Sequence, residues 1–128
     1  MIIAGVGCRK GTAAAAIEAA IVAALASSGM DARSLGLIAT AQAKANEPGI
    51  AEAAATLGVR LVLVPQIQLA GAGARALTNS ERVRRHTGVP SVAEAAALAA
   101  GGQSARLLAP RVVVGPATCA IATAGETS

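Results

Sequence analysis

MIIAGVGCRKGT, residues 1–12, contains the two features on which the predicted architecture rests. Residues 1–6 form a short apolar run rich in isoleucine, which is typical of a buried strand. Glycines and two cations follow, and Thr12 is a suitable N-cap for a helix that we expect to continue to about Ser28. The apolar face of that helix is predicted to consist of Ile17, Ile21 and Leu25. A buried strand, a glycine-rich turn and a helix in this order predict the first unit of an α/β fold.

The same alternation continues through the first half of the chain. Further strands are predicted at residues 35–40 and 60–64. Between them we expect a helix with Pro48 in its first turn and Gly58 at its end. Strands separated by helices at this spacing imply right-handed crossovers and parallel pairing.

The second half is less regular until residue 91. Residues 66–69 are expected to begin a short helix, and the glycines at 71–73 to form a flexible segment. Ser91 and Glu94 make a capping box for a helix that ends near Ala100. Further short elements are a helix at 80–86 and strands at 105–109, 112–114 and 118–122, the last two forming a hairpin. We therefore predict one α/β domain, residues 1–128, with a mixed, mostly parallel sheet, helices on both faces and a C-terminal hairpin.

Composition narrows the functional classes. The 128 residues are 54% hydrophobic and contain no aromatic side chain, which argues against nucleic-acid readers that stack bases on aromatic rings. The longest apolar run, residues 12–26, is interrupted by Glu18 and is shorter than the roughly 20 residues that a membrane span needs. Residues 1–6 lack the basic region of a signal peptide, so we expect a cytoplasmic protein. Its high apolar content is compatible with a homo-oligomer.

Charge and cysteine content point to an anionic small molecule rather than a metal. The formal net charge is +4, with the cations scattered along the chain. The two cysteines, Cys8 and Cys119, and the single histidine, His86, are too few for a structural zinc site, so no metal and no cofactor are expected.

The segment between the first strand and the first helix is the leading candidate site. Backbone N–H groups and the helix dipole favour an anion there, and Arg9 and Lys10 add positive charge. Because Lys10 precedes Gly11, the order is not that of a phosphate-binding P-loop. We expect the thiol pKa of Cys8 to be lowered, although a small buried residue filling a gap is the alternative. The predicted ligand-binding residues are Gly7, Cys8, Arg9, Lys10, Gly11 and Thr12; the alternative is a tight turn that needs its glycines for geometry alone.

Two further polar segments are candidates. Lys44 and Glu47 follow the second strand and would act as cation and general base, with Asn46 donating a hydrogen bond. Alternatively, Asn46 caps the next helix and Glu47 complements its dipole. The segment containing Ser80, Glu81 and Arg82 would close over carboxylates, or else form a solvated helix face.

Several motifs together resemble a known family. They occupy residues 5–12, 44–49, 80–83, 88–98 and 118–122, in the order that the family has, and cover nearly the whole chain. On these motifs the sequence is similar to the cobalamin-biosynthesis CobE family, which itself resembles the C-terminal domain of CbiG. One position departs from the family pattern, because Gln42 stands where an acidic residue is common.

The resemblance implies a role in building the corrin ring. Its ligand would be a precorrin or a hydrogenobyrinic acid-type molecule, with carboxylates around an apolar macrocycle that suit Arg9, Lys10 and Lys44. The leading hypothesis is a carrier or accessory factor of the aerobic pathway, with other corrin-pathway enzymes as partners. A CbiG-like lactone hydrolase, releasing acetaldehyde and using Lys44 and Glu47, is the second hypothesis. A phosphate- or nucleotide-binding module is the third.

Overall fold

The computed structural model describes residues 1–79, 92–102, 104–109 and 111–124. Its strands are β1 (Ile2–Cys8), β2 (Leu35–Ala41), β3 (Arg60–Val64), β4 (Arg106–Leu107), β5 (Val112–Val114) and β6 (Ala117–Thr123). Its helices are α1 (Ala14–Ser27), α2 (Pro48–Leu57), α3 (Gln66–Asn79) and α5 (Val92–Gly101), with 3-10 turns η1 (Ala32–Ser34) and η2 (Gln42–Lys44). The alternation of strand and helix predicted for the first half is confirmed.

All six strands of the described chain belong to one sheet, in the order β3-β2-β1-β6-β4, with β5 also paired to β6. The pairs β1–β2 and β2–β3 are parallel, whereas β6 is antiparallel to β1, β4 and β5. Within the described residues, β6 therefore runs opposite to all other strands. This confirms a mixed sheet and the predicted hairpin of β5 and β6, although the pairs made by β6 are antiparallel and only the β1–β2 and β2–β3 pairs of the described chain are parallel.

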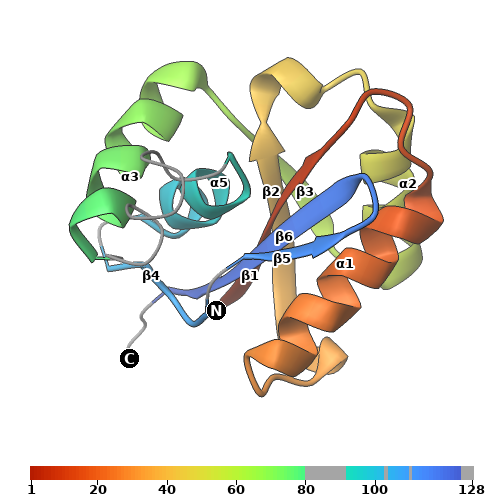
Figure 1. Ribbon diagram of the computed structural model, residues 1–128, viewed down its shortest axis with the longest axis horizontal. Coiled ribbons are helices and arrows are strands. Elements are labelled where there is room, and N and C mark those ends of the chain that lie inside the picture. The colour runs from red at the N-terminus through yellow and green to blue at the C-terminus, as the bar shows by residue number, and fades with distance from the viewer. Residues whose placement is uncertain (80–91, 103, 110, 125–128) are drawn as a thin grey trace.

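Helices cover both faces of the sheet, with α1 and α2 on one side and α3 and α5 on the other (Figure 1). The predicted face of α1 is confirmed, because Ile17, Ile21 and Leu25 are all buried against the sheet. A second core on the opposite face is rich in alanine, to which α5 contributes Ala95, Ala96 and Ala97. Among the described residues, no helix is long and apolar enough to cross a membrane.

The close approach of α5 to the sheet depends on Gly5 in β1. A Cβ atom at this position would overlap the carbonyl oxygen of Ala93 and lie 2.7 Å from the backbone nitrogen of Ala97. Glycine is therefore required because the backbone of a helix occupies the space of a side chain. This contact brings the N-terminal turn of α5 beside the end of β1.

The N-terminal caps of two helices, α1 and α2, differ from the prediction. The N-cap of α1 is Ala13, not Thr12, and no side chain caps it. The Thr12 hydroxyl donates instead to the carbonyl oxygen of Arg9 at 2.6 Å, which closes the preceding turn. The alternative assignment of Asn46 as a cap is also wrong, because Glu47 occupies the N-cap of α2 and its side chain makes no capping bond.

Later elements both confirm and correct the prediction. Gly58 ends α2 with φ +73°, as expected of a C-terminal glycine. The predicted flexible segment at 71–73 is wrong, because α3 continues through it from Gln66 to Asn79. Glycine costs a helix only about 1 kcal/mol relative to alanine, which packing against a neighbour such as α5 offsets. The predicted helix at 80–86 and the Ser91 cap lie outside the described residues.

Candidate functional site

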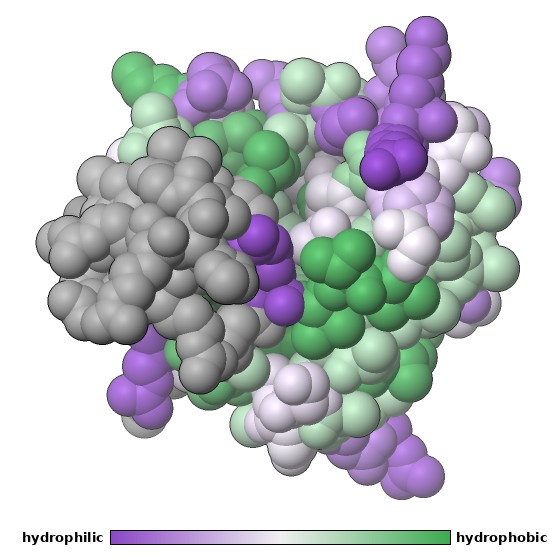
Figure 2. Space-filling view, in the orientation of Figure 1, coloured by the Kyte–Doolittle hydropathy of each residue, from purple (hydrophilic) through white to green (hydrophobic). Residues whose placement is uncertain are grey.

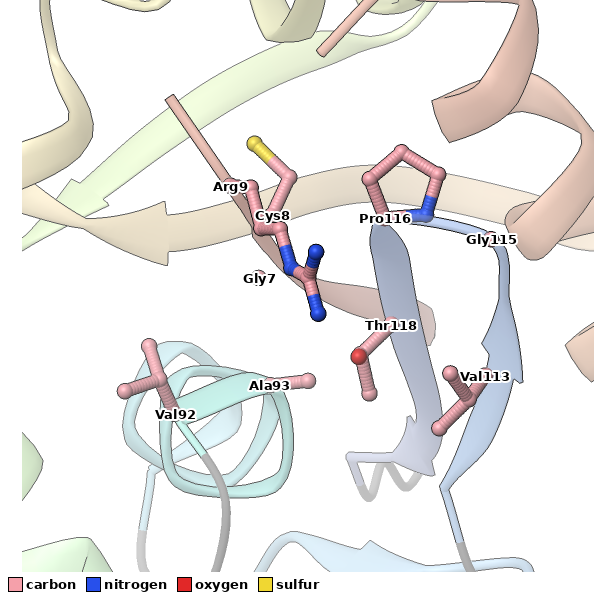
Figure 3. Close-up of a pocket in the computed structure, with 9 residues that line it drawn as sticks. All are labelled: Gly7, Cys8, Arg9, Val92, Ala93, Val113, Gly115, Pro116 and Thr118. Atoms are coloured by element: carbon pink, nitrogen blue, oxygen red, sulfur yellow. The ribbon is translucent and has the colours of Figure 1, made fainter. Parts of the chain in front are cut away.

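A pocket of about 310 Å³ opens at the carboxyl end of β1 (Figure 3). It lies between the end of β1, the N-terminal turn of α5 and the β5–β6 hairpin. The residues that line it are Gly7, Cys8, Arg9, Val92, Ala93, Val113, Gly115, Pro116 and Thr118. Ligands of open α/β sheets bind at the carboxyl ends of strands, so the position is one that this type of fold favours.

The pairing of β1 explains why space opens here. Its pairing with β2 ends at Gly5, whereas its pairing with β6 continues to Cys8, which lies opposite Ala117. Beyond Gly5 the backbone of β1 therefore pairs with β6 alone, while the Thr40 hydroxyl of β2 donates to the Val6 carbonyl at 2.7 Å. The first turn of α5 leaves room beside Gly7, because a Cβ there would lie 3.8 Å from the Ala93 nitrogen, an ordinary van der Waals contact.

In the turn that follows β1, both the backbone N–H and the backbone carbonyl of Arg9 form hydrogen bonds. Its N–H donates to the Pro116 carbonyl at 3.1 Å, and its own carbonyl accepts from the backbone nitrogen of Thr12 at 3.2 Å. Gly11 has φ +79°, as at the third position of a type II turn. The guanidinium of Arg9 points into the pocket, toward Thr118 and α5 (Figure 3).

The pocket combines positive charge with exposed apolar surface. Val92 and Val113 stand on opposite walls and are 47% and 63% exposed. The N-terminal turn of α5 borders the pocket with Val92 and Ala93 and carries the positive end of the helix dipole. The pocket would therefore accommodate a ligand that places an anionic group beside Arg9 and an apolar surface against the two valines.

A buried ion pair links two of the pocket walls. Glu94, in the first turn of α5, is completely buried, and its Oε1 lies 3.6 Å from Nη1 of Arg111, next to β5. A carboxylate in the first turn of a helix is favoured by the dipole, and burial strengthens its attraction to the guanidinium. The pair joins α5 to the start of β5.

A second polar cluster lies on the β2 side of the turn and comprises Cys8, Gly11, Thr12, Lys44 and Glu47. Glu47 Oε1 accepts a hydrogen bond of 2.8 Å from the backbone N–H of Gly11. The sulfur of Cys8 points away from the Arg9 guanidinium and hence from the pocket (Figure 3). This arrangement joins the two loops that follow β1 and β2.

The expected lowering of the Cys8 thiol pKa is wrong. Burial raises the pKa, and this effect exceeds the lowering caused by hydrogen bonding with Thr12 and by the ammonium of Lys44. The carboxylate of Glu47 raises it further. The thiol of Cys8 is therefore protonated at neutral pH.

The structure divides the predicted site residues into groups. Gly7, Cys8 and Arg9 border the pocket, whereas Gly11, Thr12, Lys44 and Glu47 belong to the second cluster. Lys10 and Asn46 are exposed and are not among the lining residues. Ser80, Glu81 and Arg82 lie outside the described residues. Their predicted roles remain predictions.

Sequence reasoning did not assign the opposite walls of the pocket. Val92, Val113 and Thr118 have ordinary strand or helix patterns, and no local signal marks them as ligand contacts. Their segments nevertheless include or adjoin motifs that resemble the family, and this resemblance was the one sequence feature that could have indicated them.

In the described part of the chain, no group of three or more His, Cys, Asp or Glu residues is placed to hold a metal ion.

Comparison with known proteins identifies the family. The family described as Cobalamin synthesis G C-terminus matches residues 2–122. A curated protein named CobE, from Sinorhizobium sp, is 35% identical over 121 residues, which are 94% of this chain and 79% of that protein.

Solved structures agree with this assignment. The crystal structure of the cobalamin biosynthesis protein chiG from Agrobacterium tumefaciens str. C58 is 48% identical, with a TM-score of 0.82 over 98% of this chain and 100% of that chain. The crystal structure of CobE, a protein from the cobalamin (vitamin B12) biosynthetic pathway, is 33% identical, with a TM-score of 0.80 over 95% of this chain and 89% of that chain. Sequence, fold and family profile coincide over nearly all of the chain, which therefore belongs to the cobalamin synthesis G C-terminus family of cobalamin biosynthesis proteins.

Proposed function

We propose that the protein binds an anionic precorrin or corrin intermediate at the β1 pocket and serves the aerobic cobalamin pathway as a carrier or accessory factor. The observation that supports this most directly is the Arg9 guanidinium, directed into a pocket whose opposite walls expose Val92 and Val113. A precorrin has carboxylates around an apolar macrocycle. Its carboxylates would suit the Arg9 guanidinium, and its macrocycle would suit the apolar surface of Val92 and Val113. Family membership gives the pathway in which such a ligand occurs.

The size of the pocket limits how such a ligand would bind. At about 310 Å³ it lies near the lower end of ligand pockets, which span roughly 300–1,000 Å³. A macrocycle with its side chains is larger than this. We therefore expect one edge of the ring, with one or two carboxylate arms, to enter between α5 and the hairpin while the remainder stays outside.

The exposed surface around the pocket supports this arrangement. An apolar patch lies over β5 near the centre of the face shown in Figure 2, and hydrophilic residues rise beside it over the turn that follows β1. The apolar part of a macrocycle resting on β5 would thus keep its carboxylates near Arg9. Each charge-assisted hydrogen bond to such a carboxylate contributes about 1.5–3 kcal/mol.

The hydrolase and nucleotide hypotheses remain predictions from the sequence. Glu47 and Lys44 lie in the second cluster, and neither lines the pocket that contains Arg9. The carboxylate of Glu47 is moreover engaged with the Gly11 amide, so one of its oxygens already accepts a hydrogen bond within the protein. These features favour binding over turnover.

Titration with hydrogenobyrinic acid, followed by the visible absorbance of the ligand, tests the proposal. Arg9→Ala should weaken binding roughly 10- to 100-fold, because a charge-assisted contact is lost. Arg60→Ala is the matched control, since Arg60 is exposed at the opposite end of the parallel strands and its loss should leave affinity unchanged. Absence of saturable binding by the parent protein, or equal affinity of the Arg9→Ala variant, would overturn the proposed function.

A further inference from the structure

The hydrogen bond between Gly11 and Glu47 connects two loops that lie 36 residues apart in the sequence. It joins an exposed backbone amide to a carboxylate oxygen at 2.8 Å, so it is a charge-assisted bond of good length. Gly11 is also the residue of the turn with the greatest backbone freedom, because it adopts φ +79° without a side chain. A fixed acceptor at this amide restricts the part of the turn that is otherwise easiest to move.

The backbone that carries Glu47 is itself well anchored. Its N–H donates to the Lys44 carbonyl at 3.0 Å, and its carbonyl accepts from the Ile50 nitrogen at 3.2 Å. Gly49, in the first turn of α2, packs so closely on the start of α1 that a Cβ there would overlap the Thr12 carbonyl oxygen. The carboxylate is therefore presented to Gly11 from a rigid base, at the contact between α1 and α2.

The restrained turn is the one that holds Arg9. On its hairpin side, the Arg9 N–H is bonded to the Pro116 carbonyl; within the turn, Thr12 bonds the Arg9 carbonyl. The Gly11–Glu47 bond fastens the same turn on its α2 side. We propose that Glu47 is a positioning residue, which holds the Arg9–Thr12 turn through the Gly11 amide and so keeps the Arg9 guanidinium directed into the pocket. Its effect on ligand affinity rests on the proposed function.

A rival interpretation makes the opposite prediction. In that case the Gly11 amide would be an anion-binding site that the Glu47 carboxylate fills in the ligand-free protein. A ligand carboxylate would have to displace Glu47 in order to bind there. The location of the pocket favours positioning, because Arg9 lines it and Gly11 does not. In the rival case removal of the carboxylate would free the amide and tighten anion binding.

The positioning role is tested first on the ligand-free protein, by ¹⁵N relaxation of the backbone amides. In Glu47→Ala, the order parameters of Lys10 and Gly11 should fall from the rigid range of about 0.85 toward the flexible range below about 0.6. Glu47→Gln retains an oxygen acceptor without the charge and should keep both residues rigid. Glu52→Ala, which removes an exposed carboxylate from the same helix, is the control. Unchanged order parameters in Glu47→Ala, or equal loss in Glu47→Gln, would overturn the proposal.

Titration of the same variants with hydrogenobyrinic acid tests the consequence for binding. Glu47→Ala should weaken binding by about 3- to 10-fold, the effect of losing one exposed hydrogen bond, whereas Glu47→Gln and Glu52→Ala should stay within about twofold of the parent. Tighter binding by Glu47→Ala would refute positioning in favour of the rival, and equal affinity would refute any effect of Glu47 on the ligand. If the parent binds no corrinoid, the proposed function fails, and the relaxation data alone decide whether Glu47 holds the turn.

Discussion

The two thiols of the chain differ in environment although both belong to strands of the central sheet. Cys119 is fully buried in β6, and burial raises its pKa to about 12. Cys8 is half-buried at the end of β1, and its pKa is also raised, chiefly by burial. A thiolate is therefore disfavoured at both positions in the folded protein, and neither thiol is activated for nucleophilic attack at neutral pH.

The buried thiol of Cys119 predicts a loss of stability at alkaline pH. Because its pKa is higher in the folded than in the unfolded state, its contribution is full below pH 9 and is lost progressively between pH 9 and about 12. A single such group changes the free energy of unfolding by about 1.4 kcal/mol per pH unit in that window. Urea unfolding followed by circular dichroism at pH 8–10.5 measures this slope.

Cys119→Ala should make that slope shallower by about the contribution of one proton. Glu18→Gln, a change on the outer part of α1, serves as a control that leaves the slope unchanged. An identical slope in the parent protein and in Cys119→Ala would contradict the prediction.

Packing between elements depends on small residues where α5 crosses β1. Gly5 faces the backbone of α5 at Ala93 and Ala97, and the buried face of this helix is mostly alanine. A helix that approaches a sheet so closely gains many van der Waals contacts but tolerates no additional atoms. Because Ala93 also lines the pocket, the same contact sets the width of the site.

Gly5→Ala should therefore destabilise the protein by about 1–3 kcal/mol, the usual cost of overpacking a core. Gly71→Ala is the matched control, because Gly71 lies in α3 with nothing within 4 Å of the added Cβ. That variant should be neutral or more stable by up to about 1 kcal/mol, since alanine is the better helix former. Thermal unfolding of both proteins tests the pair, and equal effects would show that close packing at Gly5 is unimportant.

The pocket forms only when segments from distant parts of the chain come together in the folded protein. Its walls come from β1 near the N-terminus, from α5, and from the β5–β6 hairpin near the other end of the described chain (Figure 1). The sheet brings them together because β6 inserts beside β1, with Ile2 opposite Thr123 and Cys8 opposite Ala117. Loss of this pairing would separate the charged and apolar walls.

Placing a charge on the apolar wall should weaken ligand binding without unfolding the protein. Val113→Asp removes exposed apolar surface beside the pocket and introduces repulsion toward ligand carboxylates, so we expect a loss of roughly 10-fold or more. Val22→Asp is the matched control, because Val22 is also about half exposed but lies on α1, outside the pocket lining. Absorbance titration compares the two, and an equal effect on affinity would exclude a specific role for Val113.

Patterns confined to neighbouring residues were sufficient to predict much of the fold. Residues 60–64 form a strand with the predicted bounds, and Gly58 ends the preceding helix, because both depend on local alternation and on the backbone freedom of glycine. Helices on both faces followed from the strand–helix order. The cap at Thr12 and the pKa of Cys8 were mispredicted, because a hydroxyl can bond to an earlier carbonyl and a thiol responds to burial by distant elements.

The sequence by itself determined the α/β class, the approximate elements of the first half, and the presence of cations and glycines after the first strand. These properties are encoded in local periodicity, turn residues and composition. Tertiary structure alone decided that Arg9 lines one pocket with Val92 and Val113 and that the Gly11 amide donates a hydrogen bond to Glu47. The physical reason is that both arrangements join residues distant in sequence, and sheet order and helix packing place them together without any local signal.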